Sequence, residues 1–364
     1  MIKAGIIGCG KIADSHAEQI QRIPDCEIVG VCDREILMGK QMFERYKIKN
    51  YYDDVNIFLE DSKPDVVHIT TPPQSHFDLG KTCLNAGIHV YIEKPFTLFT
   101  NEAEELIRIA NEKKLKLTVG HDDQFTHASR QMRELIQAGY LGGDPVHMES
   151  YYCYDFGSGE YAKALLGNRN HWVRQLPGKL LHNVISHGIC RIAEYVSCDS
   201  PTVIAYGYTS QSLMSLNIMD IIDELRVIIS WNEKSTAYFT FSSQMRPTLH
   251  HFRIFGPKNA VYMDHDQQTI IKAGGERYKS YLEKFIPPIL YSKQYASNTV
   301  SNVFKFIKND FHMKSGMKFL IESFYDSITN DKPIPIPHKE ILLTTKIMED
   351  IFRQLEEKPY LLRI

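Results

Sequence analysis

The sequence lacks any apolar run long enough to cross a membrane, and its cysteines follow no zinc or disulfide pattern. No stretch approaches the roughly 18 consecutive apolar residues that a spanning helix needs, so we expect no membrane span. The seven cysteines are odd in number and scattered, with no C-x-x-C pair. We therefore predict free, mostly buried thiols in a reducing cytoplasm, and no metal site. No secretory signal precedes the first apolar segment.

A strong charge of either sign is also absent. The 364 residues carry 42 Lys and Arg against 44 Asp and Glu, a formal net charge of -2. This balance gives no reason to expect a nucleic-acid partner. With 43% hydrophobic and 24% charged residues, the composition is that of a globular protein long enough for two domains.

What the sequence does contain begins at its first residues. An apolar run of strand type, 2–7, is followed by Gly8, Gly10 and Ala13 in the spacing G-x-G-x-x-A, and then by a helix-compatible segment, 14–22. The first glycine allows a tight turn, the second lets the backbone approach a pyrophosphate, and the small third residue lets the helix pack on the strand. The helix N-terminus offers N–H groups to the phosphates. The order predicts a dinucleotide site.

A second predicted strand, 27–32, leads to Asp33, 23 residues after Gly10. An acid about 20 residues after the glycines hydrogen-bonds the ribose 2'-hydroxyl and repels a 2'-phosphate, so we favour NAD. Arg34 could stack on adenine or pair with a 2'-phosphate, which leaves NADP as the alternative.

Strand and helix patterns alternate through the first part of the chain. After 27–32 we expect strands at 66–70, 89–92 and 115–119, each preceded by a helix, at 55–60, 77–86 and 101–114. This alternation predicts a parallel sheet of Rossmann type over residues 1–122.

The remainder, residues 123–364, changes character. A helix is expected at 128–138, a helical tail from Met317 onward, and strands at 146–153, 202–208, 225–231, 236–242 and 252–255. We predict an α+β domain with an open, mainly antiparallel sheet, one face of which is covered by helices. The other face would be a subunit interface or a substrate wall, hence a homodimer or homotetramer. The final helices can pack back on the Rossmann domain.

Four motifs together resemble the glucose-fructose oxidoreductase and inositol dehydrogenase family (Gfo/Idh/MocA) over essentially the whole chain. They are G-C-G-K-I-A, T-P-P-Q-S-H, E-K-P and the segment around Asn183 and His187. The resemblance implies an NAD(P)-dependent oxidoreductase that acts on a sugar, a cyclitol or a sugar nucleotide. It implies cofactor contacts from Gly8, Gly10, Lys11, Ile12, Asp33, Arg34, Thr71, Pro72, His76, Glu93, Lys94 and Pro95.

Lys94 matches the lysine that in this family lies beside the nicotinamide and the reacting hydroxyl, and Pro95 resembles its cis-type proline turn. Ligands sit at the carboxyl ends of parallel strands, where a lysine can hydrogen-bond a developing alkoxide. The alternative is a surface lysine at a strand end.

Residues 176–188 resemble the family's glycine-rich turn into a helix that carries D-x-x-x-H. Positions four apart share a helix face, so we expect Asn183 and His187 to point at the cleft, with His187 as general base. Asn183 stands where an aspartate is usual, and it cannot carry charge. A second enzyme class therefore stays open, in which NAD oxidises a glycoside transiently and elimination follows without net redox. A cofactor-binding regulator without turnover is the third reading.

The resemblance also suggests substrate-binding residues with structural alternatives. Asp122 and Asp123 could bind sugar hydroxyls or cap the next helix, and Trp172 and Arg174 could form an apolar wall and a diphosphate anchor or belong to the core. The substrate-binding set is His121, Asp123, Gln124, Trp172, Arg174 and Asn183.

Residues 278–313 match no motif of the family. They mix aromatic and aliphatic residues with lysines, a composition that can bind a membrane surface. We favour a helical insertion that packs on the sheet or on a neighbouring subunit.

Overall fold

A computed structural model describes residues 1–155 and 159–357. The chain divides into two compact units, one comprising residues 1–122 and 316–346, the other 123–315 and 347 onward. The sequence had assigned the whole of 123–364 to the second domain, with the option that the final helices return. The segment 316–346 belongs to the first unit. Residues 358–364 of the expected helical tail lie outside the described part.

The first unit is built on a six-stranded sheet with the order β3-β2-β1-β4-β5-β6, in which every neighbouring pair is parallel. This is the doubly wound order of dinucleotide-binding domains, which reverses between β1 and β4. The Rossmann prediction is confirmed. The strands are β1 (Ile2–Ile7), β2 (Cys26–Cys32), β3 (Tyr51–Tyr52), β4 (Val66–Ile69), β5 (His89–Ile92) and β6 (Leu117–Val119).

Helices in the crossovers of this sheet bury one apolar face each. In α5 the buried positions are Ala103, Leu106, Ile109 and Ala110, the spacing of one helix face. All four residues of β4 are buried, as expected for a central parallel strand. The helices are α1 (Lys11–Ile20), α2 (Ile36–Tyr46), α3 (Val55–Ser62), α4 (His76–Asn85), α5 (Thr100–Glu112) and α12 (Ser315–Thr329), with the short 3-10 turn η1 (Pro73–Ser75).

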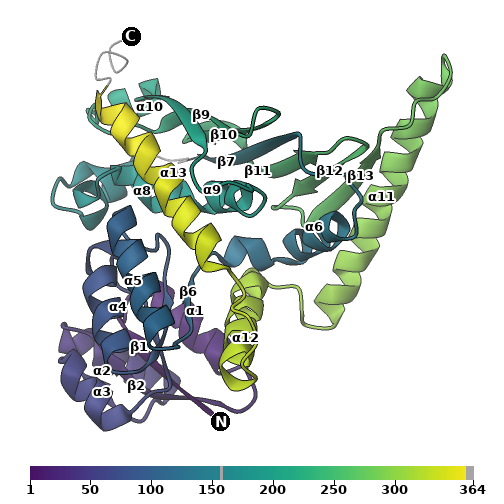
Figure 1. Ribbon diagram of the computed structural model, residues 1–364. Helices are drawn as coiled ribbons and strands as arrows, with labels where there is room; N and C mark the ends of the chain where they lie inside the picture. The colour runs from purple at the N-terminus through teal and green to yellow at the C-terminus, as the bar shows by residue number, and fades with distance from the viewer. Residues whose placement is uncertain (156–158, 358–364) are drawn as a thin grey trace. The chain divides into compact units, whose positions relative to one another are not determined.

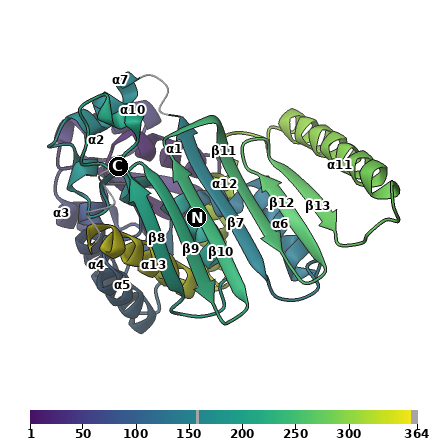
Figure 2. The ribbon, with the colours of Figure 1, turned by 90° about the horizontal axis from the view of Figure 1, so that it is seen from above.

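The second unit contains a seven-stranded sheet with the order β13-β12-β11-β7-β10-β9-β8 (Figure 2). Only β7 and β10 pair in parallel, so the predicted mainly antiparallel sheet is confirmed. The strands are β7 (His147–Asp155), β8 (Thr202–Tyr208), β9 (Glu224–Trp231), β10 (Ser235–Ser242), β11 (Gln244–Phe255), β12 (Asn259–Asp264) and β13 (Thr269–Gly274).

The sequence predicted only the end of β11 and neither β12 nor β13. The first residues of β11 are mostly exposed and include Pro247, so they show no apolar alternation. The last two strands have six residues each and form an antiparallel pair at the sheet edge. Runs this short give little periodicity to read.

One face of this sheet contacts helices, and the other carries a row of partly exposed side chains. In α9 the carbonyl of Gly188 accepts a 2.9 Å hydrogen bond from Ser150 Oγ of β7. Strand register aligns Ile204, Ile228 and Tyr238 across the opposite face, each more than 40% exposed. The helices of this unit are α6 (His127–Gln137), α7 (Gly159–Ala162), α8 (Lys179–Val184), α9 (Ser186–Ala193), α10 (Gln211–Met214) and α11 (Leu282–Ile307), with three short turns, η2 (Asp122–Phe125), η3 (Lys163–Gly167) and η4 (Trp172–Gln175). The last helix, α13 (His338–Glu357), begins in the first unit and ends in the second.

The long helix α11 lies along the edge strand β13 (Figures 1 and 2). Three amide side chains, spaced four residues apart, bond to the strand's backbone and the turn before it. Gln294 accepts from the backbone N–H of Lys272 and donates to its carbonyl, and Asn298 does the same with Ile270. Asn302 donates to the carbonyls of Gln267 and Gln268. The helix thus occupies backbone groups that an open sheet edge would expose. Within residues 1–155 and 159–357, no helix has the length and apolar character to cross a membrane.

Candidate functional site

The predicted cofactor residues follow the carboxyl ends of the parallel strands in the first unit. Backbone bonds tie these loops together, from Gly8 N to the Cys32 carbonyl at 2.8 Å and from Glu93 N to the Ile69 carbonyl at 2.9 Å. Gly8 has a φ of +95°, and a Cβ there would lie 2.6 Å from Thr71 Cγ2. The tight turn after β1 therefore requires glycine.

Gly10 is the N-cap residue of α1, and a Cβ built on it meets nothing within 4 Å. The turn therefore leaves open space directly over the helix N-terminus, where a pyrophosphate would bind backbone N–H groups. Lys11 is exposed and Ile12 half-buried.

Asp33, just past β2, turns its carboxylate toward the same turn. Its oxygens accept from Cys9 N at 2.7 Å and from Glu35 N at 2.9 Å. A carboxylate has about four lone-pair sites, so two remain for ribose hydroxyls. Arg34 is exposed beside it. The open space at Gly10 and this oriented acid fit a dinucleotide.

The Lys94–Pro95 peptide bond is cis, in agreement with the turn that the sequence suggested. His76 stands behind this turn. Its ring is fully buried, with Nδ1 2.9 Å from the Pro95 carbonyl and Nε2 2.9 Å from the Thr71 carbonyl. Burial lowers the pKa of His76. His76 therefore connects the turn after β4 to the turn after β5, and its ring has no open side for the cofactor contact that we had expected.

Glu93 is at the end of a buried chain of hydrogen-bonding groups that the sequence did not reveal. Its Oε1 lies 2.8 Å from His16 Nε2, the Nδ1 atoms of His16 and His68 are 2.8 Å apart, and His68 Nε2 is 2.7 Å from the Tyr325 hydroxyl. Burial would raise the pKa of Glu93, but the bond and charge of His16, together with Lys94, lower it. Burial holds the pKa of His68 well below its usual value. The carboxylate next to Lys94 is therefore ionised.

A signal for His16 was present in the sequence. His16 lies three residues after Ala13 and four before Ile20, on the face of α1 that is buried. A histidine on the apolar face of the helix after the glycine turn predicts a buried polar partner. His68 and Tyr325 carried no such signal, because they meet only through the tertiary fold.

In the second unit, Asn183 and His187 lie on two consecutive short helices rather than on one. The break comes at Ile185, with Asn183 in α8 and His187 in α9. The single-helix prediction was wrong, since Ser186 starts a new helix. Between Leu180 and Ala193, however, Asn183 and His187 are the two residues that are not buried. Despite the break between the two helices, both side chains are therefore partly accessible to solvent.

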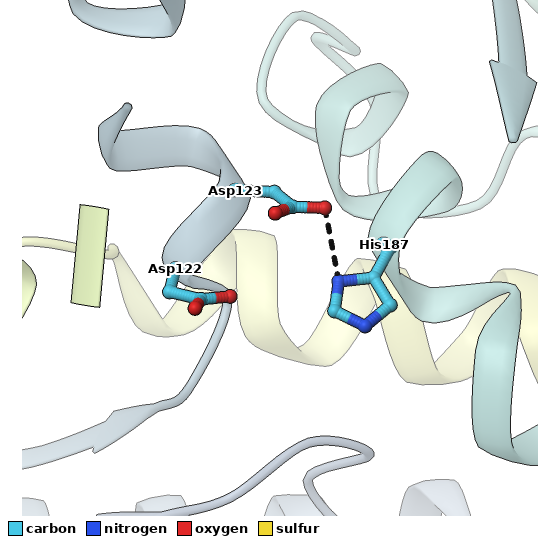
Figure 3. Close-up of side chains that lie close together, drawn as sticks. All are labelled: Asp122, Asp123 and His187. Carbon is cyan, nitrogen blue, oxygen red and sulfur yellow. Dashed lines mark ion pairs between the residues drawn. The ribbon is translucent and has the colours of Figure 1, made fainter. Parts of the chain in front are cut away.

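Asp123 faces His187 (Figure 3). Its Oδ2 lies 3.1 Å from His187 Nδ1, an ion-pair contact, and 3.4 Å from an Arg191 guanidinium nitrogen. Burial would raise the pKa of Asp123, but His265, His187 and Arg191 hold it well below its usual value. Thr126, not Asp122 or Asp123, caps α6 by accepting from Ser129 N, so the capping alternative was wrong.

Two further residues hold this pair in place. The Tyr152 ring stacks on His187 with centroids 5.0 Å apart and planes at 15°. Arg191 donates to His265 Nδ1 at 2.9 Å, which leaves Nε2 of that ring to carry its proton toward Asp123 Oδ1 at 3.4 Å. Burial lowers the pKa of His265 to about 4, so this imidazole is neutral.

Comparison with known protein families gives a match to the first unit. The family described as oxidoreductase family, NAD-binding Rossmann fold (GFO_IDH_MocA) matches residues 2–121. The N-terminal domain belongs to this oxidoreductase family. Over these residues the family resemblance and the NAD-binding domain that we inferred from the sequence are therefore confirmed.

Two curated relatives match about two fifths of the chain. D-glucoside 3-dehydrogenase of Escherichia coli (strain K12) is 32% identical over 142 residues, 39% of this chain and 40% of the relative. UDP-N-acetylglucosamine 3-dehydrogenase of Acidithiobacillus ferrooxidans is 32% identical over 149 residues, 41% of this chain and 44% of the relative. The matched segment spans less than half of each of these proteins.

Solved structures resemble the chain over nearly all of its length. That of the Acidithiobacillus ferrooxidans UDP-N-acetylglucosamine 3-dehydrogenase has a TM-score of 0.74 at 20% identity, and the match covers 98% of both chains. The WlbA dehydrogenase from Bordetella pertussis, in complex with NADH and UDP-GlcNAcA, has a TM-score of 0.76 at 17% identity, covering 98% of this chain and 96% of the other. At these identities the likeness shows the fold.

Not every substrate-binding residue suggested by the family resemblance is available for that role. Gln124 is buried and donates to the Cys190 carbonyl and to Glu194. The Arg174 guanidinium is 7% exposed and contacts both carboxylate oxygens of Asp220, at 2.8 and 2.6 Å. Arg174 is therefore already paired, and the expected diphosphate anchor is not supported.

The remaining predicted residues differ in how exposed they are. Trp172 is 36% exposed in η4, with its ring against that of His171. His121 is buried in the first unit, two residues after the end of β6. Lys94 and His187 belong to different units, so the structure describes each within its own unit.

Proposed function

We propose that this protein is an NAD-dependent dehydrogenase that oxidises a secondary hydroxyl of a sugar or sugar nucleotide. The observation that carries the proposal is the pairing of the half-buried His187 imidazole with the ionised Asp123 carboxylate. An imidazole held this way is an oriented general base, and the same chain contains an NAD-binding domain.

Asp123 contacts Nδ1, and Nε2 lies on the other side of the ring (Figure 3). The proton on Nδ1 therefore faces the carboxylate, and Nε2 is the atom that takes the substrate's hydroxyl proton. Asp123 then stabilises the imidazolium that forms, as the aspartate does in other catalytic histidine–aspartate pairs. The bound NAD would supply the hydride acceptor.

Asn183 has a different role in this arrangement. Since Asp123 provides the negative charge, residue 183 needs only to hold a hydroxyl, which an amide can do. We considered the redox-neutral alternative because residue 183 is not an aspartate. Since Asp123 supplies a carboxylate beside His187, the asparagine at 183 no longer favours that alternative. Lys94, at the end of β5, would hydrogen-bond the alkoxide as hydride leaves.

The substrate class rests on the relatives. Two of them are named as 3-dehydrogenases of a D-glucoside and of UDP-N-acetylglucosamine, which supports oxidation of a hexopyranose at its 3-hydroxyl. Because Arg174 is already paired with Asp220, it gives no support for a diphosphate in the substrate, and simple glucosides are equally good candidates.

The test is turnover with NAD in excess. Alkyl and aryl glucosides, UDP-N-acetylglucosamine and inositol are incubated with the protein, while NADH absorbance and product mass are followed. We expect NADH in proportion to a product that has lost two hydrogens. Aglycone release without NADH would replace the proposal with redox-neutral elimination. No product from any of them, despite bound NAD, would favour a regulator.

His187→Gln should abolish this turnover, and His251→Gln is the matched control. His251 also contacts an aspartate at 3.1 Å, Asp264, but at a different place in the sheet domain. Equal loss in both variants would contradict the assignment of His187.

We also propose a cytoplasmic homo-oligomer. All seven cysteines are free, and burial raises the pKa of Cys83 to about 12, which suits a reducing compartment. Mass measurement in solution tests the assembly, and fractionation of the source cells tests the location.

A further inference from the structure

The helix α11 presents two different faces. Gln294, Asn298 and Asn302 bond to β13 and its preceding turn, and this face is partly covered. No residue of the 26-residue helix is buried. The side away from β13 is apolar and exposed, with Val300 at 54%, Val303 at 52% and Ile307 at 71%.

Five of the exposed apolar residues, Leu282, Ile289, Val300, Val303 and Ile307, occupy positions of a heptad repeat. One set of positions, seven residues apart, is Leu282, Ile289, Ala296 and Val303. Alternating steps of four and three residues are what keep one seam facing a partner helix in a coiled coil.

The second set lies four residues after the first. It comprises Ile286, Lys293, Val300 and Ile307, so that one lysine interrupts an otherwise apolar seam. A single polar residue at such a position is known to fix the register and orientation of paired helices. With 3.6 residues per turn, the seam lies opposite the face that carries Asn298.

We propose that this seam pairs with the α11 seam of a second copy of the chain, in antiparallel orientation. Antiparallel pairing about the helix centre sets Leu282 against Ile307 of the second copy, and Ile289 against Val300. It sets Lys293 against the small Ala296 of the second copy, where there is room for the long side chain. Every position of the seam then has a partner, as a twofold interface requires.

Parallel pairing would be worse for two physical reasons. It would place Lys293 against Lys293 of the second copy, two like charges in an apolar seam. It would also set Ala296 against Ala296, which leaves a gap. The charge and size pattern of this one seam therefore selects the antiparallel arrangement.

A lipid surface is the competing occupant. Helices that lie on anionic membranes place lysines along the borders of their apolar face. Here Lys284 and Lys305 are 14 and 7 residues from Asn298 along the chain, so they share the face that is turned toward β13. Burial lowers the pKa of Lys305. These cations are on the wrong side for a membrane.

Mass measurement by light scattering tests the pairing. The wild-type chain of 42.0 kDa should assemble in an even number, and Val303→Glu should halve the assembly. Ser301→Glu is the matched control, because it adds the same charge on the same helix outside the seam. Circular dichroism confirms that both variants fold. A monomeric wild type, or a Val303→Glu assembly of unchanged mass, would overturn the proposal.

Cross-linking tests the orientation. Ile289→Cys and Val300→Cys chains, mixed and oxidised, should join to each other, whereas Ile289→Cys alone should not join to itself. In the antiparallel pair the two copies of residue 289 are roughly 16 Å apart, beyond the reach of a disulfide. Self-joining of Ile289→Cys would overturn the antiparallel pairing.

Vesicle sedimentation tests the lipid alternative. Vesicles rich in phosphatidylglycerol should leave the wild-type protein in the supernatant at physiological salt. Binding that Val303→Glu abolishes, in a protein that is monomeric, would assign the seam to a membrane instead.

Discussion

His16 Nε2 lies 2.8 Å from Glu93 Oε1 in the interior of the Rossmann domain. The contact joins α1, which begins at the glycine turn, to the residue that precedes Lys94. Glu93 Oε2 in turn accepts from the backbone N–H of Lys94 at 3.2 Å. The turn predicted to bind the pyrophosphate and the turn predicted to lie beside the nicotinamide are thus connected by one buried hydrogen bond.

Replacing Glu93 by Gln should destabilise the folded protein by about 1–3 kcal/mol, because the buried hydrogen bond between His16 Nε2 and the Glu93 carboxylate would be weakened or lost. Chemical denaturation followed by circular dichroism measures the change. Glu112→Gln removes a carboxylate from an exposed pair with Arg108 and should leave the unfolding midpoint unchanged. Equal midpoints for both variants would contradict a structural role for the buried pair.

Lys94→Met should abolish turnover and leave NADH binding nearly intact. The side chain is assigned to the reacting hydroxyl, whereas most of the cofactor contacts are assigned to other residues, among them Asp33 and the glycine turn. NADH fluorescence titration separates binding from chemistry. Turnover that survives the substitution would remove Lys94 from the mechanism.

Asp123→Asn should lower kcat by about 100-fold or more with little change in KM, because the imidazolium of His187 would lose its counter charge. The matched control is Asp264→Asn, which removes the other carboxylate that lies 3.1 Å from a histidine nitrogen. If the loss appears in KM instead, Asp123 binds the substrate and does not position the base.

Asp33→Ala should weaken NAD binding and reduce discrimination against NADP. The carboxylate contacts the backbone of the glycine turn and repels a 2'-phosphate. Dissociation constants for both cofactors, measured by calorimetry, give the result. An unchanged NAD constant would sink the ribose assignment.

Stability should fall as the pH drops from 6.5 to about 4, with His265 as one named cause. Burial lowers the pKa of His265 from 6.5 to about 4, so the unfolded chain binds more protons than the folded one in this window. The integrated loss from this group is about 3 kcal/mol. Chemical denaturation at pH 7 and at pH 4 gives the free energy of unfolding at each pH. Between the two, His265→Gln should lose about 3 kcal/mol less than the wild type does. A pH dependence equal to that of the wild type would contradict it.

The sequence by itself determined the features that depend on local spacing. The glycine turn, Asp33 after β2, Lys94 after β5 and the strand alternation were all legible, since each follows from neighbours along the chain and from side-chain periodicity. The heptad seam of α11 is equally local, although its exposure is not. Local patterns also set the limits of β8 and β5 correctly.

Only the tertiary structure decided which distant side chains meet. Asp123 contacts His187 across 64 positions of sequence, so no spacing rule could have assigned Asp123 as the partner of the base. Arg174 contacts Asp220 across 46 positions, so no spacing rule could have shown that Arg174 is already paired. The chain His16, His68 and Tyr325 is of the same kind. Burial makes such polar contacts obligatory, because an unpaired polar group in the interior is costly, but which groups satisfy one another is settled by packing.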